Sequence, residues 1–449
     1  MRVLMLSWEY PPYSVGGLAR HVEDLAETMV KQNCSVHVLT TGSAELPAKE
    51  NRNGVLVHRV QAYNLNTPDF LTWVMQLNLA FLERAIEIMS REGLFQIIHA
   101  HDWLVAYCGK ALKHAYQRPL VATIHATEAG RNQGLHNEQQ RYISSVEWWL
   151  TYEAWRVIVC SQYMFREVRQ LFQLPEDKIV VIPNGVRPEK LQKAFPDPEI
   201  QRMVKAEEEI IFFIGRLVRE KGVQVLLHAM PAVLAARPKS KLIIAGTGPM
   251  QEELRSLSDR LGIRSRVYFA GYVDDIAKNF FYKKARVAVF PSLYEPFGIV
   301  ALEAMAAGVP VVVADTGGLA EIVTHRENGL KAYPADVSSL ASNIIELLRD
   351  ERLRDEIRRR AGELIRKQYS WDLICRNTVD VYKKVWEEYA GSSWPTSKGS
   401  LGKAVGYCRS FLPGKGRGNK REPAVTRTKS LIEQRVLTVN QHPEGRSGL

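Results

Sequence analysis

Residues 291–318, PSLYEPFGIVALEAMAAGVPVVVADTGG, guide the interpretation of the whole sequence. Glu295 stands in a turn-rich segment after an apolar run, and Glu303 follows eight residues later. We expect a helix to begin near Gly298, with the backbone N–H groups of its first residues forming an anion-binding end. Glu303 would lie one turn inside that helix, where a carboxylate can accept both hydroxyls of a ribose.

A plainer interpretation of the two glutamates also exists. Glu303 could offset the helix dipole and Glu295 could be a surface loop residue. Glu303 is, however, flanked by Val300, Ala301, Leu302, Ala304 and Met305. A carboxylate in such apolar surroundings is rarely found without a partner.

Outward from this segment, short β-branched runs alternate with amphipathic stretches such as Ala19–Val30 and Phe70–Ser90. This alternation predicts parallel sheets covered on both faces by helices. The expected strands are Arg2–Ser7, Ser35–Thr40, Gln96–His99, Leu120–Ile124, Val157–Val159, Ile179–Ile182, Ile210–Ile214, Lys241–Ala245, Arg266–Ala270, Arg286–Phe290 and Val309–Ala314. The Pro-, Gly- and charge-rich composition of residues 184–207 is typical of a linker.

We therefore predict two doubly wound α/β domains, residues 1–195 and 196–370, followed by a helix over 371–390 that packs across the domain junction. Ligands of such sheets bind at the carboxyl ends of the strands. Two such domains facing one another would hold their site in the cleft between them.

Composition narrows the class of protein. The 449 residues are 46% hydrophobic and 24% charged, which is ordinary for a globular protein. The longest apolar stretch, Ile299–Ala314, is interrupted by Glu303, Gly308 and Pro310, so we expect no membrane span. The five cysteines are scattered singly, which argues against disulfide or zinc frameworks and indicates a cytoplasmic protein.

The net charge of +11 is unevenly distributed. Residues 391–449 hold eleven Lys/Arg and three Asp/Glu, so +8 of the excess lies there. Their Gly/Ser/Lys-rich composition predicts a disordered, solvated tail. We therefore expect no specific nucleic-acid partner, with weak attraction to anionic polymers or membrane surfaces as the alternative.

Two further segments could contact phosphates. Gly16–Gly17 precede an expected helix, which suits either a phosphate loop or a tight turn. The segment GRLVREKG follows the strand Ile210–Ile214 and contains Arg216 and Lys221, five residues apart. Two cations there could neutralise a diphosphate without a metal ion, or simply form a solvated turn.

Taken together, EPFGIVALEAMAAGVPVV, GRLVREKG, IPNGV and the N-terminal GGL resemble family 4 retaining glycosyltransferases of the GT-B fold. The resemblance runs from Met1 to about Tyr389. HAHDW, TIHATEAGRNQGLH and EWWLTYEAWRVIVCSQYM resemble the glycogen-synthase-like branch. One departure is that Ser14 stands where glycogen and starch synthases carry the lysine of Lys-x-Gly-Gly-Leu.

The resemblance implies residue roles by position. Arg216 and Lys221 match diphosphate-binding cations, and Glu303 matches the ribose-binding glutamate. Glu295 matches the glutamate that contacts the transferred sugar, and His125 the histidine beside the anomeric carbon. The remaining matched positions are Gly17 beside the phosphates, the helix-end amides of Gly298, Ile299 and Val300, and Asp102 and Glu9 in the sugar and acceptor pocket.

Other features have ordinary interpretations. His99 and His101 alternate along a strand and could ligate a metal, but strand-end histidines are more often packed. Asp274–Asp275 lack the spacing of a metal-binding Asp-x-Asp motif and are expected to start a helix. Trp148, Trp149 and Trp155 could stack on sugars, but their spacing favours core positions.

We therefore expect a metal-independent retaining glycosyltransferase with no cofactor. It would move a hexose, glucose first, from ADP- or UDP-glucose to an α-glucan or small glucoside acceptor. The alternatives are another hexosyltransferase with a mannosyl or lipid-linked substrate, and a catalytically silent glycan- or nucleotide-binding regulator. A dehydrogenase is disfavoured because the chain lacks GxGxxG and an acidic ribose partner after the second strand.

Overall fold

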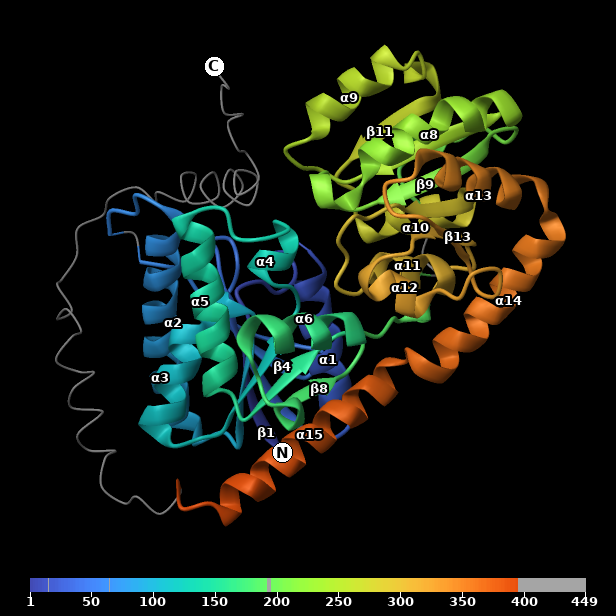
Figure 1. The fold of residues 1–449 in the computed structure, drawn as a ribbon. Helices are drawn as coiled ribbons and strands as arrows, with labels where there is room; N and C mark the ends of the chain where they lie inside the picture. The colour runs from blue at the N-terminus through green and yellow to red at the C-terminus, as the bar shows by residue number, and fades with distance from the viewer. Residues whose placement is uncertain (15, 64, 192–194, 395–449) are drawn as a thin grey trace. The chain divides into compact units, whose positions relative to one another are not determined.

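The computed structural model describes residues 1–394 apart from residues 15, 64 and 192–194 (Figure 1). These residues form two compact units. Of the described residues, unit 1 comprises Met1–Val159, Phe165–Ile182 and residues 374–394, and unit 2 comprises Cys160–Met164 and Pro183–Leu373. The predicted tail, residues 391–449, lies outside the described residues from residue 395 on.

Unit 1 is built on a sheet of eight strands in the order β3-β4-β2-β1-β5-β6-β7-β8. Every neighbouring pair is parallel except β3 and β4. The central strands are buried along almost their whole length, as a parallel sheet covered on both faces requires. The strands are β1 (Arg2–Leu6), β2 (Ser35–Thr41), β3 (Lys49–Arg52), β4 (Val55–Val60), β5 (Ile97–His101), β6 (Leu120–Ile124), β7 (Arg156–Val159) and β8 (Ile179–Val181).

The helices of unit 1 follow the strands in alternation. They are α1 (Gly17–Lys31), α2 (Phe70–Glu92), α3 (Ala106–Tyr116), α4 (Glu128–Arg131), α5 (Glu138–Glu153) and most of α6 (Gln162–Phe172). In Figure 1, α2, α3 and α5 lie side by side, and both α2 and α5 pack against α3.

The β3–β4 hairpin was not among the expected strands. Its two-residue turn is Asn53–Gly54, with φ of 51° and 88°. Two successive left-handed residues are typical of the tight turn that joins antiparallel strands, and Asn-Gly is its strongest sequence signal. The Asn53–Gly54 pair in the sequence was therefore a sufficient signal to predict this hairpin.

The expectation that the tryptophans are core residues is wrong for Trp148. Helix α5 buries Ile143, Val146 and Leu150, which are spaced three and four residues apart. Trp148 lies on the opposite face, where 44% of its surface is exposed, and it stacks on the exposed Tyr152. Trp149 and Trp155 are half-buried.

Unit 2 holds an entirely parallel sheet in the order β11-β10-β9-β12-β13-β14. Its strands are β9 (Glu209–Ile214), β10 (Ser240–Ala245), β11 (Val267–Gly271), β12 (Ala285–Phe290), β13 (Val311–Ala314) and β14 (Leu330–Ala332). Its helices are α7 (Pro198–Arg202), α8 (Val223–Ala236), α9 (Gln251–Arg260), α10 (Asp275–Lys284), α11 (Ile299–Ala306), α12 (Gly317–Ile322), α13 (Val337–Arg349) and α14 (Glu351–Gln368). The predicted pair of doubly wound α/β domains is confirmed.

The change from unit 1 to unit 2 falls at Ile182/Pro183, earlier than the boundary at residue 195. The boundary lies earlier because the residues just after it pair with residues of unit 2. Val186 N–H donates to the Tyr369 carbonyl at 2.9 Å. A Cβ on Gly185 would lie 2.8 Å from Trp371 Cδ2, so this segment packs tightly on unit 2.

The final helix, α15 (Trp371–Gly391), covers the range predicted for it. Its first three residues belong to unit 2 and the rest to unit 1. Among the described helices, none combines the length and the apolar character needed to cross a membrane. The apolar stretch Ile299–Ala314 instead forms α11 and β13.

Candidate functional site

The N-terminus of α11 forms as the sequence predicts. Gly298 is the N-cap residue, and its φ of 107° lies in the left-handed region that favours glycine. A Cβ at this position would also lie 2.5 Å from Leu319 Cδ2 and 3.7 Å from Glu295 Cγ. The helix therefore begins beside the Glu295 side chain, and the Ala301 and Leu302 N–H groups already donate to the Gly298 carbonyl, so the amides of Ile299 and Val300 are the ones at its N-terminal end.

Glu295 pairs with one of the two predicted cations. Its Oε2 accepts a hydrogen bond from Lys221 Nζ at 2.7 Å and from Ser292 Oγ at 3.2 Å. The Glu295 side chain is 10% exposed and that of Lys221 is 25% exposed. The structure thus brings together two residues to which the resemblance gives separate roles.

The main chain of Glu295 is held by a glycine pair that the sequence analysis did not assign. Gly318 N–H donates to the Glu295 carbonyl at 2.8 Å. A Cβ on Gly317 would lie 2.1 Å from that carbonyl oxygen, so only glycine permits the approach. The GG at the start of α12 therefore positions the loop that carries Glu295.

Arg216 and Lys221 both follow β9. Arg216 lies two residues past the end of this strand and is half-buried, and Lys221 closes a short turn at Arg219–Lys221. Gly222 then has a φ of 71°, and a Cβ there would lie 1.9 Å from the Pro291 carbonyl oxygen. The turn is thereby packed directly against the segment that leads to Glu295.

Glu303 has a buried partner, as its apolar neighbours in the sequence suggested. The partner is Lys278 of α10, whose Nζ lies 2.9 Å from Glu303 Oε1. The two side chains are 5% and 10% exposed. Tyr282 OH lies 3.1 Å from the Val300 carbonyl and 3.5 Å from Glu303 Oε2.

Asp274 and Asp275 begin a helix, as predicted. The Asp274 side chain caps α10 by accepting the Ala277 N–H at 2.8 Å. Asp275 Oδ1 lies 3.1 Å from Lys278 Nζ. The acidic pair therefore supports the lysine that contacts Glu303.

In unit 1, the predicted residues Asp102 and His125 are in direct contact. They follow the neighbouring strands β5 and β6, and His125 N–H donates to Asp102 Oδ1 at 2.7 Å. His101 Nδ1 lies 3.2 Å from His125 Nε2, and the ring of His21 packs edge-on at 4.7 Å. Burial lowers the pKa of His125 to about 3, helped by the charge of Arg131, so its imidazole is neutral at pH 7.

Asp102 has an unusual backbone and an unusual acidity. Its φ is 62°, a region that non-glycine residues seldom adopt. Burial raises the pKa of Asp102 to about 6, opposed by the charge of Arg131 and by the backbone N–H groups of His125 and Ala126. Strained residues of this kind cluster at functional sites.

His99 is packed rather than open. Its Nε2 lies 2.8 Å from Thr123 Oγ1 and its Nδ1 lies 2.6 Å from Tyr382 OH. His101, two residues along the strand, joins His21 and His125 in a group whose ring nitrogens lie within 4.8 Å of one another. Burial lowers the pKa of both His99 and His101 well below the usual value.

A second group, His37, His58 and Glu92, has equally close ligand atoms. It lies on β2, β4 and the last turn of α2. The two imidazoles hydrogen-bond to each other at 3.1 Å, and Lys49 Nζ binds Glu92 at 2.8 Å. His58 Nδ1, by contrast, is buried without a hydrogen-bond partner among the described residues.

Gly17 is the first residue of α1, after the extended N-cap Gly16. The same helix carries His21, whose ring packs against that of His125. Glu9 is buried, and its carbonyl accepts the Ser7 hydroxyl at 2.7 Å.

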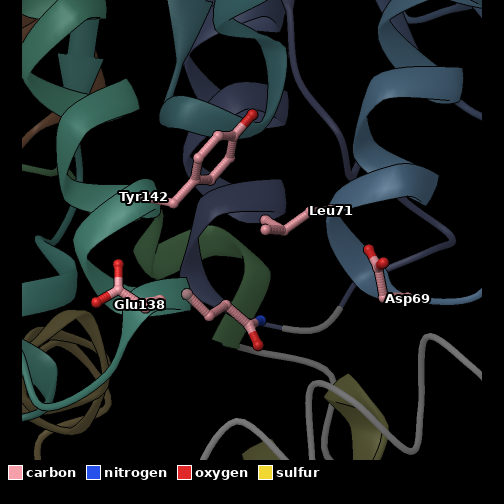
Figure 2. A pocket seen from close by; sticks show the side chains of 5 residues that line it. Asp69, Leu71, Glu138 and Tyr142 are labelled. Atoms are coloured by element: carbon pink, nitrogen blue, oxygen red, sulfur yellow. The ribbon is translucent and has the colours of Figure 1, made fainter.

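An open pocket of about 450 Å³ lies between the first turns of α2 and α5 (Figure 2). It is lined by Asp69, Leu71, Glu138, Gln139 and Tyr142. Because α2 and α5 run into β5 and β7, their N-termini lie at the carboxyl edge of the sheet, as do Asp102 and His125. The sequence analysis did not identify this pocket.

Comparisons with known proteins bear on this arrangement. Residues 15–190 match the sequence profile described as Glycosyltransferase Family 4, and residues 198–364 match that of Glycosyl transferases group 1. The chain belongs to glycosyltransferase family 4. The profiles fall on the two halves of the chain that carry the histidine group and the two glutamates.

Relatives span nearly the whole fold. An uncharacterised glycosyltransferase of Methanocaldococcus jannaschii is 42% identical, over 86% of this chain and 99% of its own length. The glycogen synthase of Mycobacterium tuberculosis is 34% identical, over 85% of this chain and 94% of its own. The structure of sucrose-phosphate synthase from Thermosynechococcus elongatus superposes with a TM-score of 0.75 at 26% identity, covering 87% of this chain and 100% of that one.

Proposed function

We propose that this glycosyltransferase moves glucose from ADP- or UDP-glucose to an α-glucan or related glucoside, with retention of configuration and without a metal ion. The observation that carries the proposal is the pairing of each glutamate with its own lysine around α11. Lys221 holds Glu295 beside the start of the helix, and Lys278 holds Glu303 inside it. The similarity to a glycogen synthase supports glucan as the acceptor class.

The donor would bind with its diphosphate at the N-terminus of α11. There the first-turn amides, Arg216 and Lys221 can neutralise the charge that develops on the leaving group. Lys221 is the more exposed member of its pair, so it can exchange Glu295 for a phosphate oxygen. Preorganised donors of this kind supply a large share of catalysis in many enzymes.

In the reaction, the bond between the sugar C1 and the diphosphate oxygen breaks and a bond from C1 to the acceptor oxygen forms on the same face. The acceptor proton passes to the leaving phosphate oxygen. Glu295 would contact the transferred sugar and Glu303 the ribose. His125, neutral because of its burial, would lie beside the positively charged sugar without repelling it.

The pocket of Figure 2 supports an acceptor rich in hydroxyl groups. Carboxylates, an amide and a phenol are groups that bind hydroxyls, and Leu71 adds an apolar surface. The buried cysteines Cys34, Cys108, Cys160 and Cys375 form no disulfide among the described residues, which supports a reducing, cytoplasmic location.

The deciding experiment measures nucleotide release from ADP-, UDP- and GDP-linked glucose and mannose, with glycogen and maltose as acceptors. We expect ADP- or UDP-glucose to be used, with an α-linked product by NMR. Preference for a mannose donor would establish another hexosyltransferase. Tight nucleotide binding without turnover on any acceptor would instead indicate a silent binding protein.

A further inference from the structure

Lys278 is the most deeply buried charged partner around the two glutamates. Only 4% of the residue is exposed, and its Nζ contacts Glu303 Oε1 at 2.9 Å and Asp275 Oδ1 at 3.1 Å. An ammonium removed from water loses its hydration and is retained only where carboxylates replace that hydration. Its position is therefore closely determined by the two acidic groups.

The contacts divide the Glu303 carboxylate into two ends. Oε1 accepts a hydrogen bond from Lys278 Nζ, and the Tyr282 hydroxyl lies 3.5 Å from Oε2 and 3.1 Å from the Val300 carbonyl oxygen. An ionised carboxylate oxygen has room for two acceptor interactions. A carboxylate whose place is fixed by Lys278 can therefore still accept hydroxyl protons from a ligand.

We propose that Lys278 is a positioning residue for donor recognition, holding the Glu303 carboxylate in the orientation in which it accepts the ribose hydroxyls of the nucleotide. This inference rests on the proposed use of a nucleoside diphosphate sugar. The inference also gives the Asp274–Asp275 pair a role. Asp274 caps the start of α10, and the more exposed Asp275 binds the Lys278 ammonium.

A purely structural ion pair would behave differently. If Lys278 only joined α10 to α11, its loss would lower stability and weaken all ligands equally. If Lys278 presents Glu303 to the ribose, removing Lys278 should specifically weaken the hydrogen bonds between Glu303 and the ribose hydroxyls. The difference between a ribose and a deoxyribose ligand therefore separates the two roles.

The experiment measures Kd by calorimetry for ADP, UDP and their 2′-deoxy and 3′-deoxy forms. The proteins are the full chain and the variants Lys278→Met, Lys278→Arg and Asp275→Asn. Lys284→Met is the matched control, since it removes an exposed lysine from the same helix. Melting temperatures are recorded for all five proteins, and kcat is measured at saturating donor.

We expect wild type to lose about tenfold in affinity when a ribose hydroxyl is removed, the scale of one hydrogen bond to a charged group. Lys278→Met should bind the ribose nucleotide roughly 10- to 100-fold more weakly and discriminate deoxyribose by only about twofold. Lys278→Arg should restore most of the discrimination, Asp275→Asn should show a partial loss, and Lys284→Met should match wild type. At saturating donor, kcat should change less than Kd.

Three results would overturn the inference. Lys278→Met could discriminate ribose from deoxyribose as wild type does, or wild type could fail to discriminate at all. If Lys278→Met does not fold, the inference is overturned when both Lys278→Arg and Asp275→Asn discriminate ribose from deoxyribose as well as wild type does. Failure of folded wild type to bind any nucleotide would reject the proposed function itself, which distinguishes that failure from the failure of this inference alone.

Discussion

The Lys221–Glu295 pair predicts an asymmetric effect of removing its two members. Lys221→Met leaves the Glu295 carboxylate, whose side chain is 10% exposed, with the Ser292 hydroxyl at 3.2 Å as a side-chain donor. Removing one partner of a fully buried pair costs about 3–5 kcal/mol, and partial exposure reduces this to about 2 kcal/mol here. Glu295→Gln instead leaves the more exposed Lys221, which water can solvate, at a cost of about 0.5 kcal/mol.

These values convert into measurable melting temperatures for a unit of this size. About 2 kcal/mol corresponds to roughly 4–8 °C, so ligand-free Lys221→Met should melt that much lower, and Glu295→Gln within about 2 °C of wild type. The double variant should melt above Lys221→Met, because the unpaired carboxylate is then gone. Lys284→Met is the control, and scanning calorimetry is the assay. A double variant that melts at the additive temperature or lower would refute this reasoning.

Three further predictions follow from the same contacts. Glu303→Ala should mainly weaken donor binding, by about 1.5–3 kcal/mol, whereas Glu295→Gln should mainly lower kcat; calorimetry beside single-turnover rates would expose the reverse assignment. Because two cations can neutralise the leaving diphosphate, EDTA should change the rate little and Lys221→Ala should lower turnover by on the order of 10²–10³, while strict dependence on Mg²⁺ or Mn²⁺ would reject this mechanism. The folded-state pKa of Asp102, raised to about 6, means that its contribution to stability falls as pH rises towards 6. The unfolding free energy of wild type relative to Asp102→Asn should therefore drop by about 2 kcal/mol between pH 4.5 and 7, and a difference that does not change with pH would contradict the assignment.

The fold was predictable because it depends on local patterns. The central strands of both units are apolar runs, since parallel strands covered on both faces are buried throughout. The start of α11 was predictable because Gly298 and the loop before it carry turn chemistry. The β3–β4 hairpin had a comparable signal in Asn53–Gly54, and the outward position of Trp148 follows from the period of the buried residues on α5.

The partners of the site residues could not be predicted in this way. Lys278 and Glu303 lie 25 residues apart on different helices, and no periodic pattern links them. Gly317 and Gly318 are recognisable as glycines, but their need for close approach appears only when the Glu295 carbonyl is placed against them. A sequence can indicate that a buried carboxylate needs a partner, whereas only the packing of helices identifies it.

The two lysines would also account for the different tasks proposed here for two glutamates eight residues apart. Lys221 is 25% exposed, so water or a phosphate can replace Glu295 as its partner at small cost. Lys278 is 5% exposed and lies between two carboxylates, so its release would leave a buried charge without compensation. The first pair is therefore suited to rearrange as charge develops during a reaction. The second is suited to stay fixed, as recognition of an unreacting ribose requires.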